Sequence, residues 1–181
     1  MITKDQQIRN QKILTAINNG DSQAFIDLMG ADPQQLRVVT PFGTYLHMAA
    51  SAGQIELVKY LIDAGLDINA RSGAFNGNAL NEAASEGRSE VAKYLLSHDA
   101  EIDVSDPERN PLFGAIYAAN KEIVSMLLDA GIDASIKYTG ENMMDMGAYE
   151  FAKERGQLEI ADLIGARYGK GPSAKRAKGK T

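Results

Sequence analysis

The sequence predicts an all-α repeat fold, a solenoid of about five helix–turn–helix units joined by β-hairpin-like loops. The first observation is an alanine that recurs at intervals of 33, 34, 32 and 37 residues, as Ala16, Ala49, Ala83, Ala115 and Ala152. The second is an apolar position that recurs at the same intervals, as Leu28, Leu61, Leu95, Leu127 and Ile164. Two independent positions with one shared spacing indicate repeated units, which bury their apolar faces by stacking on one another.

The stretch "LHMAASAGQIELVKYLIDAG" (46–65) indicates what one unit contains. Its alanine-rich first half favours helix, but Gly53 costs about 1 kcal/mol relative to alanine inside a helix. A second apolar period follows and stops at Gly65. Each half is shorter than the roughly 12 residues that an isolated helix needs in water. We therefore expect two short antiparallel helices that are stable only within a stack.

The break between the two helices recurs in every unit. It is glycine in four units and alanine in one, at Gly20, Gly53, Gly87, Ala119 and Gly156. Glycine suits a tight reversal because it tolerates positive φ. A glutamate follows three residues later in the last four units, where negative charge stabilises the first turn of the second helix. The interval "GLDINARSGAFNGN" (65–78) has the turn residues of a hairpin, so a hairpin-like loop should join successive helix pairs.

The segment "TYLHMA" (44–49) resembles the ankyrin repeat, whose family pattern T-P-L-H-x-A it matches except for Tyr45. "GQIELVKYLIDAGLDINA" (53–70) continues the resemblance, whereas "NALNEA" (78–83) and "NPLFGA" (110–115) are looser. The resemblance covers about residues 11–166. We place one ankyrin repeat domain in residues 1–166, with units near 11–43, 44–77, 78–109, 110–146 and 147–166.

Composition excludes several classes of protein. The chain has no cysteine, which rules out disulfides and thiolate metal sites. It has no run of eighteen apolar residues that could span a membrane. The first fifteen residues are polar and lack the apolar core of a signal peptide. We therefore expect a cytoplasmic protein.

Charge is distributed unevenly. Residues 167–181 hold six basic residues and no acidic one, whereas residues 1–166 hold 13 basic and 24 acidic residues, a net charge of −11. Such a body repels nucleic acid and attracts basic surfaces, so we expect a protein partner with a basic surface. The tail from 167 is expected to be disordered. It offers at most weak nucleic-acid binding, and its "KRAK" (175–178) is either a nuclear localisation signal or a solubilising segment.

Candidates for catalysis and metal binding are few. The resemblance implies that His47 hydrogen-bonds Thr44, and no nucleophile or orienting carboxylate accompanies it in the sequence. His98 precedes Asp99, Glu101 and Asp103, but their spacing matches no known ligand pattern, and a solvated turn with a left-handed Asp99 fits better. We expect no catalysis, no cofactor and no metal site.

The resemblance implies protein binding through the hairpin tips and through the concave face of the first helices. We define the concave face by the positions Asn18, Asn19, Ser51, Ala52, Ser85, Glu86, Tyr117, Ala118, Glu154 and Arg155. Small residues dominate it, and we take Glu86 and Tyr117 as its binding candidates, because aromatic anchors supply much of the binding energy in interfaces. The alternative for Tyr117 is packing against Ser85 or Ala118.

The loops supply four further candidates. Phe42 in "TPFGT" and Phe75 in "SGAFNGN" have little to pack against in their own turns, so they either bind a partner or fold back onto the next hairpin. Arg71 lies beside the tips and is alternatively a solvated charge. Tyr138 begins the longest interval, in which Met143, Met144 and Met146 either bind or cover the open end of the core.

We expect a protein–protein interaction module without catalysis. Residues 138–164 also resemble the last unit of small bacterial ankyrin proteins, some of which are immunity factors, so neutralisation of a cognate basic toxin is an alternative. A second alternative is an enzyme with an unrecognised site between Glu86, Tyr117 and Glu154. A third is nucleic-acid association through the tail.

Overall fold

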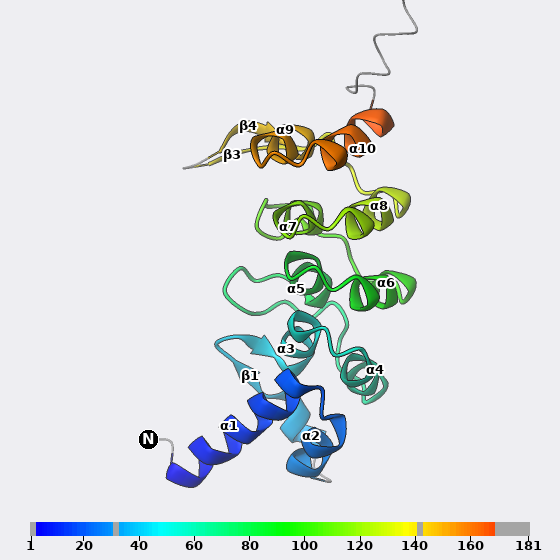
Figure 1. The fold of residues 1–181 in the computed structure, drawn as a ribbon. Coiled ribbons are helices and arrows are strands. Elements are labelled where there is room, and N and C mark those ends of the chain that lie inside the picture. Colours follow the sequence, from blue (N-terminus) through cyan, green and yellow to red (C-terminus); the bar gives the residue numbers. More distant parts are fainter. Residues whose placement is uncertain (1–2, 31–32, 141–142, 169–181) are drawn as a thin grey trace, which may run out of the picture.

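The computed structural model describes residues 3–30, 33–140 and 143–168. Within them, ten α-helices form five antiparallel pairs that stack in chain order (Figure 1). The pairs are α1 (Lys4–Asn19) with α2 (Ser22–Met29), α3 (Tyr45–Ala52) with α4 (Ile55–Asp63), α5 (Ala79–Ser85) with α6 (Ser89–Ser97), α7 (Pro111–Tyr117) with α8 (Lys121–Asp129), and α9 (Ala148–Glu154) with α10 (Leu158–Tyr168). The predicted all-α repeat solenoid is confirmed.

The loops between pairs project to one side of the stack, at the left in Figure 1. A short 3₁₀ helix, η1 (Pro33–Arg37), leads into β1 (Val39–Thr40), which pairs antiparallel with β2 (Gly43–Thr44). A single bridge between Ser72 and Gly77 closes the next loop. The last hairpin pairs β3 (Lys137–Gly140) with β4 (Met143–Gly147), with Lys137 opposite Gly147. Three of the four loops between pairs are therefore closed by antiparallel pairing, as expected for hairpins. The loop between α6 and α7, all of it described, has neither a strand nor a bridge.

The reversals between paired helices have the predicted backbone. Gly53 ends α3 with φ of 79°, and its N–H donates to the carbonyls of Ala49 and Ala50. Ala119 adopts φ of 54° at the same place in the fourth unit, although a Cβ disfavours that conformation. Asp99, with φ of 58°, takes the left-handed conformation that the sequence indicates after α6.

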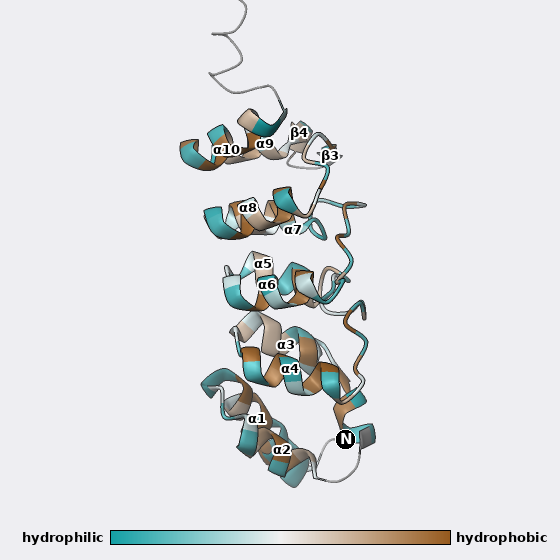
Figure 2. Cartoon of the chain, turned by 90° about the vertical axis from the view of Figure 1, so that its right-hand side faces the viewer, coloured by the Kyte–Doolittle hydropathy of each residue, from teal (hydrophilic) through white to brown (hydrophobic). Residues whose placement is uncertain are grey.

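One continuous apolar core runs through the stack. The recurring alanines are buried where neighbouring first helices approach. Of the recurring apolar residues in the second helices, Leu61, Leu95, Leu127 and Ile164 are buried and Leu28 is partly buried. Gly114 shows how close this approach is, because a Cβ there would clash with Ser85 of the preceding unit. Figure 2 shows both brown (apolar) and teal (polar) residues on the helices, as expected for helices that bury one face.

The two ends of the domain differ from the prediction. The first helix starts at Lys4, ahead of the expected unit start near residue 11, because Thr3 and Gln6 form a capping box there. The last helix continues to Tyr168, so Arg167 and Tyr168 do not belong to a disordered tail. The Tyr168 hydroxyl donates to the Ile132 carbonyl (2.7 Å), and Arg167 pairs with Asp129. The rest of the predicted tail, 169–181, lies outside the described residues.

Candidate functional site

His47 is a buried structural residue at the start of α3. Its Nε2 lies 3.0 Å from the Gly77 carbonyl oxygen, and its Nδ1 lies 2.8 Å from Thr44 Oγ1, the contact that the sequence resemblance implies. Burial lowers the pKa of His47, while its backbone hydrogen bonds partly oppose that shift. A neutral ring with the proton on Nε2 donates to the carbonyl and accepts from the threonine hydroxyl. His47 therefore fastens α3 to the next loop.

The acidic residues near His98 are engaged in loop structure. Asp103 forms an ion pair with Arg71 (2.8 Å) and lies 3.3 Å from Arg109 Nε, and its carboxylate accepts from the Ser105 hydroxyl (2.6 Å). The His98 ring lies against the Tyr94 ring, with the ring centroids 4.0 Å apart and the ring planes tilted by 31°. Over the described part of the chain, no group of three or more histidine, cysteine, aspartate or glutamate side chains is arranged to hold a metal ion.

Arg71 and Tyr138, two predicted binding residues, make contacts within the chain. The Arg71 guanidinium links its own loop to Asp103 of the next loop. The half-buried Tyr138 donates its hydroxyl to the Val104 carbonyl (2.7 Å) and accepts from Asn110 Nδ2 (2.9 Å). Its ring also meets Phe113 edge-on, at 5.2 Å. Both side chains connect neighbouring units.

The two loop phenylalanines are exposed. Phe42, between β1 and β2, is 71% exposed, and Phe75, in the loop closed by Ser72 and Gly77, is 53% exposed. The two loops are neighbours, because a Cβ on Gly73 would lie 3.8 Å from the Phe42 carbonyl oxygen. Neither phenylalanine folds back far enough to be buried. In the last hairpin Met144 is also exposed, whereas Met143 packs partly against the core.

The concave face brings Glu86 and Tyr117 onto neighbouring helix ends. Tyr117 ends α7 and is 64% exposed, and Glu86 caps α5 and is also exposed. One turn earlier on α5, the half-buried Glu82 faces the neighbouring loop, since its Oε1 would lie 3.6 Å from a Cβ on Gly73. Burial raises the pKa of Glu82, and the negative charge of Glu86 raises it further. The i, i+4 spacing of these glutamates was visible in the sequence, but Glu82 was not selected as a candidate.

Arg155 is the residue whose role sequence reasoning missed. It was placed on the concave face, but its packing was not predicted. Its guanidinium lies 4.4 Å from the ring centroid of Tyr117 and 5.5 Å from that of Phe151. Tyr117 therefore contacts the next unit through Arg155, and it does so while remaining exposed.

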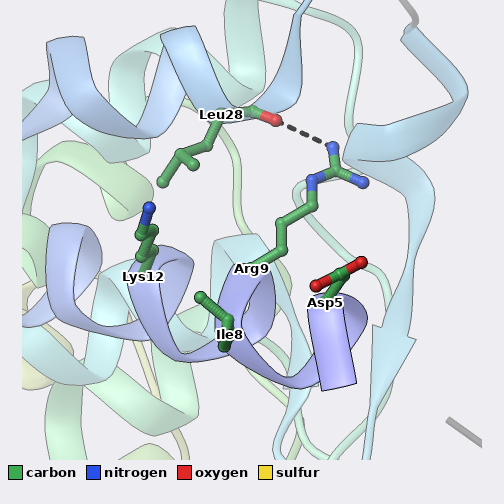
Figure 3. Close-up of a pocket in the computed structure, with 5 residues that line it drawn as sticks. All are labelled: Asp5, Ile8, Arg9, Lys12 and Leu28. Carbon is green, nitrogen blue, oxygen red and sulfur yellow. Dashed lines mark hydrogen bonds between the residues drawn. The ribbon is translucent and has the colours of Figure 1, made fainter. Parts of the chain in front are cut away.

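A further hollow lies at the N-terminal end, between α1 and α2 (Figure 3). It has a volume of about 280 Å³ and is lined by Asp5, Ile8, Arg9, Lys12 and Leu28. The Arg9 guanidinium donates to the Leu28 carbonyl (2.7 Å) and to Gln35 Oε1 (3.1 Å), so it ties the two helices together. This lining has no nucleophile paired with a base.

The enzyme alternative gains no support from contacts. Glu86, Tyr117 and Glu154 all lie in the described part of the chain, and no hydrogen bond or ion pair joins any two of them. Among the helices that the structure describes, none is both long and apolar enough to cross a membrane.

A family model for three copies of the ankyrin repeat matches residues 13–106. The match runs from α1 to the loop after α6, and α7–α10 repeat the same helix-pair geometry beyond it. A search of curated proteins found no match.

Proposed function

Because the chain belongs to the ankyrin repeat family, whose repeats are generally protein–protein interaction modules, we propose that it binds a partner protein through its hairpin tips and concave face. The observation that carries this proposal is the pair of exposed phenylalanines, Phe42 and Phe75, on neighbouring loops. A phenylalanine without a covering side chain gains free energy when a partner removes it from water, by roughly 1.5–3 kcal/mol if fully buried. Phenylalanine is among the residues that are enriched in protein interfaces relative to the rest of the surface.

The concave face extends this surface. Tyr117 offers a third exposed aromatic ring, and Glu86 offers a charge beside it. The surrounding small residues, Ser85 and Ala118 among them, leave room for a partner segment. Arg71 and Tyr138 lie in the same surface, but their polar groups are bonded within the chain, so we propose that they hold the loops that the partner contacts.

The partner should have a basic surface, because residues 1–166 carry a net charge of −11. Opposite charges accelerate association, and salt weakens that steering over about 8 Å at physiological ionic strength. We further propose a cytoplasmic location, weak nucleic-acid binding at most and no catalysis.

The same acidity supports a second candidate function, immunity against a basic toxin such as a nuclease, in a bacterial host. This function needs no other surface, since an acidic binding face can cover a basic active site. It differs from scaffolding in one measurable respect: stoichiometric binding should abolish the activity of the partner.

Capture of the partner with a matched variant tests the proposal. The wild-type protein and the double variant Phe42→Ser, Phe75→Ser are immobilised separately and exposed to the same cell extract. A protein that the wild type retains is purified, and its affinity for the wild type and for the double variant is measured by calorimetry. We expect the double variant to bind it at least tenfold more weakly, since hot-spot aromatics each contribute on the order of 1–3 kcal/mol. Equal affinity of the two proteins for that partner would place the binding surface elsewhere.

A further inference from the structure

Arg155 lies against aromatic rings at the junction of the fourth and fifth units. Its guanidinium lies over the ring of Tyr117 from α7, and near the ring of Phe151, one turn back on its own helix. Phe151 is in turn stacked on Phe113, with centroids 5.1 Å apart and planes at 24°. Phe113 is buried in the core, so the stack that supports the guanidinium is anchored in the interior.

Within the part of the chain that the structure describes, the hydrogen-bond donors of Arg155 have no partner. Among the described residues it forms no hydrogen bond and no ion pair, although the side chain is exposed. Arg71, Arg109 and Arg167 each pair with an aspartate of this acidic chain. Arg9 and Arg88 donate to carbonyl oxygens instead. Arg155 differs from these five arginines: aromatic contacts orient its planar group, and no carboxylate among the described residues neutralises it.

An arginine in this state suits one kind of ligand. Aromatic rings interact with the face of a guanidinium, which leaves the N–H groups around its edge available. Two of these N–H groups match the two oxygens of a carboxylate, which gives a short, charge-assisted bidentate pair. The formation of such a pair normally costs conformational entropy of the arginine side chain. Part of that cost has already been met, because the guanidinium is stacked on aromatic rings before a ligand binds.

We propose that Arg155, oriented by Tyr117, is the anchor for an aspartate or glutamate side chain of the partner protein. This inference rests on the proposed function, because it uses the same concave face, and it adds that the basic surface of the partner must contain a carboxylate. A singly charged carboxylate suits the site better than a phosphate dianion, because the body around Arg155 is acidic.

The rest of the concave face, together with the adjacent Glu82, defines an order of groups on the partner. Glu82 and Glu86 lie on the third unit, Tyr117 on the fourth and Arg155 on the fifth. Burial raises the pKa of Glu82 and the charge of Glu86 raises it further. A cation placed between the two carboxylates would be attracted by both of them. A partner segment along this face should therefore present a basic group, an apolar group and then an acidic group.

Peptide selection tests the inference without knowledge of the natural partner. A displayed library of random peptides is selected on the full-length protein, and selected peptides are labelled and measured by fluorescence polarisation. We expect them to contain an aspartate or glutamate whose change to the amide weakens binding about tenfold or more, the scale of a charged hydrogen bond. Arg155→Ala should weaken binding equally, and the two changes together should cost no more than one of them.

Two further variants separate the bidentate geometry of the Arg155 guanidinium from its positive charge. Arg155→Lys keeps the charge but cannot pair bidentately, so it should restore only part of the affinity. Lys153→Ala removes one positive charge from the same helix and should change affinity by less than about twofold. Melting curves of all variants verify that they are folded.

The possible failures are distinguishable. Peptides that lose affinity with Phe42→Ser, Phe75→Ser but are indifferent to Arg155→Ala would overturn the carboxylate anchor and leave the proposed function standing. A carboxylate that matters equally in wild type and Arg155→Ala would also overturn the anchor. Peptides that are indifferent to all of these variants would overturn both proposals.

Discussion

The loop that carries Phe75 and the hairpin that carries Tyr138 use their aromatic residues in different ways. Both segments are rich in glycine, asparagine and polar residues, and both join successive helix pairs. Phe75 is exposed and has no polar group to bond, whereas the Tyr138 hydroxyl connects Val104 of the preceding loop with Asn110 at the start of α7. The hydroxyl lets a loop tyrosine satisfy backbone and amide groups of the chain itself. An exposed loop phenylalanine is the better sign of a binding surface.

The largest effect should come from a substitution in the core, and it is the reference for the effects of substitutions in the two loops. Leu61→Ala removes a fully buried side chain of α4, so it should lower the free energy of unfolding by about 2–5 kcal/mol. Urea unfolding measures this loss, and the surviving folded protein should bind its partner normally. A loss below about 1 kcal/mol would mean that the units do not depend on one shared core.

The next largest effect concerns the exposed aromatics. Phe75→Ala and Tyr117→Ala should each weaken partner binding by on the order of 1–3 kcal/mol, as hot-spot aromatics do. Each should change the free energy of unfolding by less than about 1 kcal/mol, because both side chains are mostly exposed. Calorimetry and urea unfolding on the same samples give the two numbers. Destabilisation as large as that of Leu61→Ala, with normal binding, would identify both residues as core.

The converse result is expected for Tyr138. Tyr138→Phe keeps the ring against Phe113 but removes the hydroxyl that serves Val104 and Asn110. It should therefore cost about 1–3 kcal/mol of unfolding free energy, the penalty for unpaired, partly buried polar groups. Partner affinity should change little. If Tyr138→Phe instead left stability unchanged and weakened binding, Tyr138 would be a partner-binding residue like Phe75.

The contrast between the loops explains what the sequence could predict. The repeat and the reversals at Gly53 and Ala119 follow from local chemistry that recurs in register, and the Thr44–His47 contact follows from the resemblance to the ankyrin pattern. The start of α1 also had a signal, since Thr3 and Gln6 fit the capping-box pattern. The hydroxyl contacts of Tyr138 and the stacking of Arg155 had none. They depend on side-chain directions across two units, which no spacing along the chain determines.

A smaller effect should appear on acidification, through the His47 contact between α3 and the Phe75 loop. Burial lowers the pKa of His47 from its ordinary value of 6.5, so below that value the unfolded chain binds more protons than the folded one. The contribution of His47 to stability is thus complete above pH 6.5 and declines as the pH falls toward the lowered pKa. Urea unfolding between pH 7.5 and 5 on the wild type and on His98→Gln, whose side chain is exposed, measures it. Both proteins should lose the same amount of stability on acidification. If the loss disappears in His98→Gln, it arises from His98 and not from His47.

The smallest effect distinguishes the end of the last helix from the segment that follows it. Removal of residues 169–181 should leave the unfolding free energy within about 0.5 kcal/mol, since a segment of glycine, lysine and serine makes few native contacts. Removal from residue 167 also deletes the Tyr168 hydrogen bond to Ile132 and the Arg167 pair with Asp129, and should cost about 1–2 kcal/mol. The shorter deletion removes five of the six basic residues of the tail, so any salt-sensitive binding of nucleic acid should disappear with it. Equal melting curves for the two truncations would mean that the contacts of Tyr168 and Arg167 contribute nothing to the last unit.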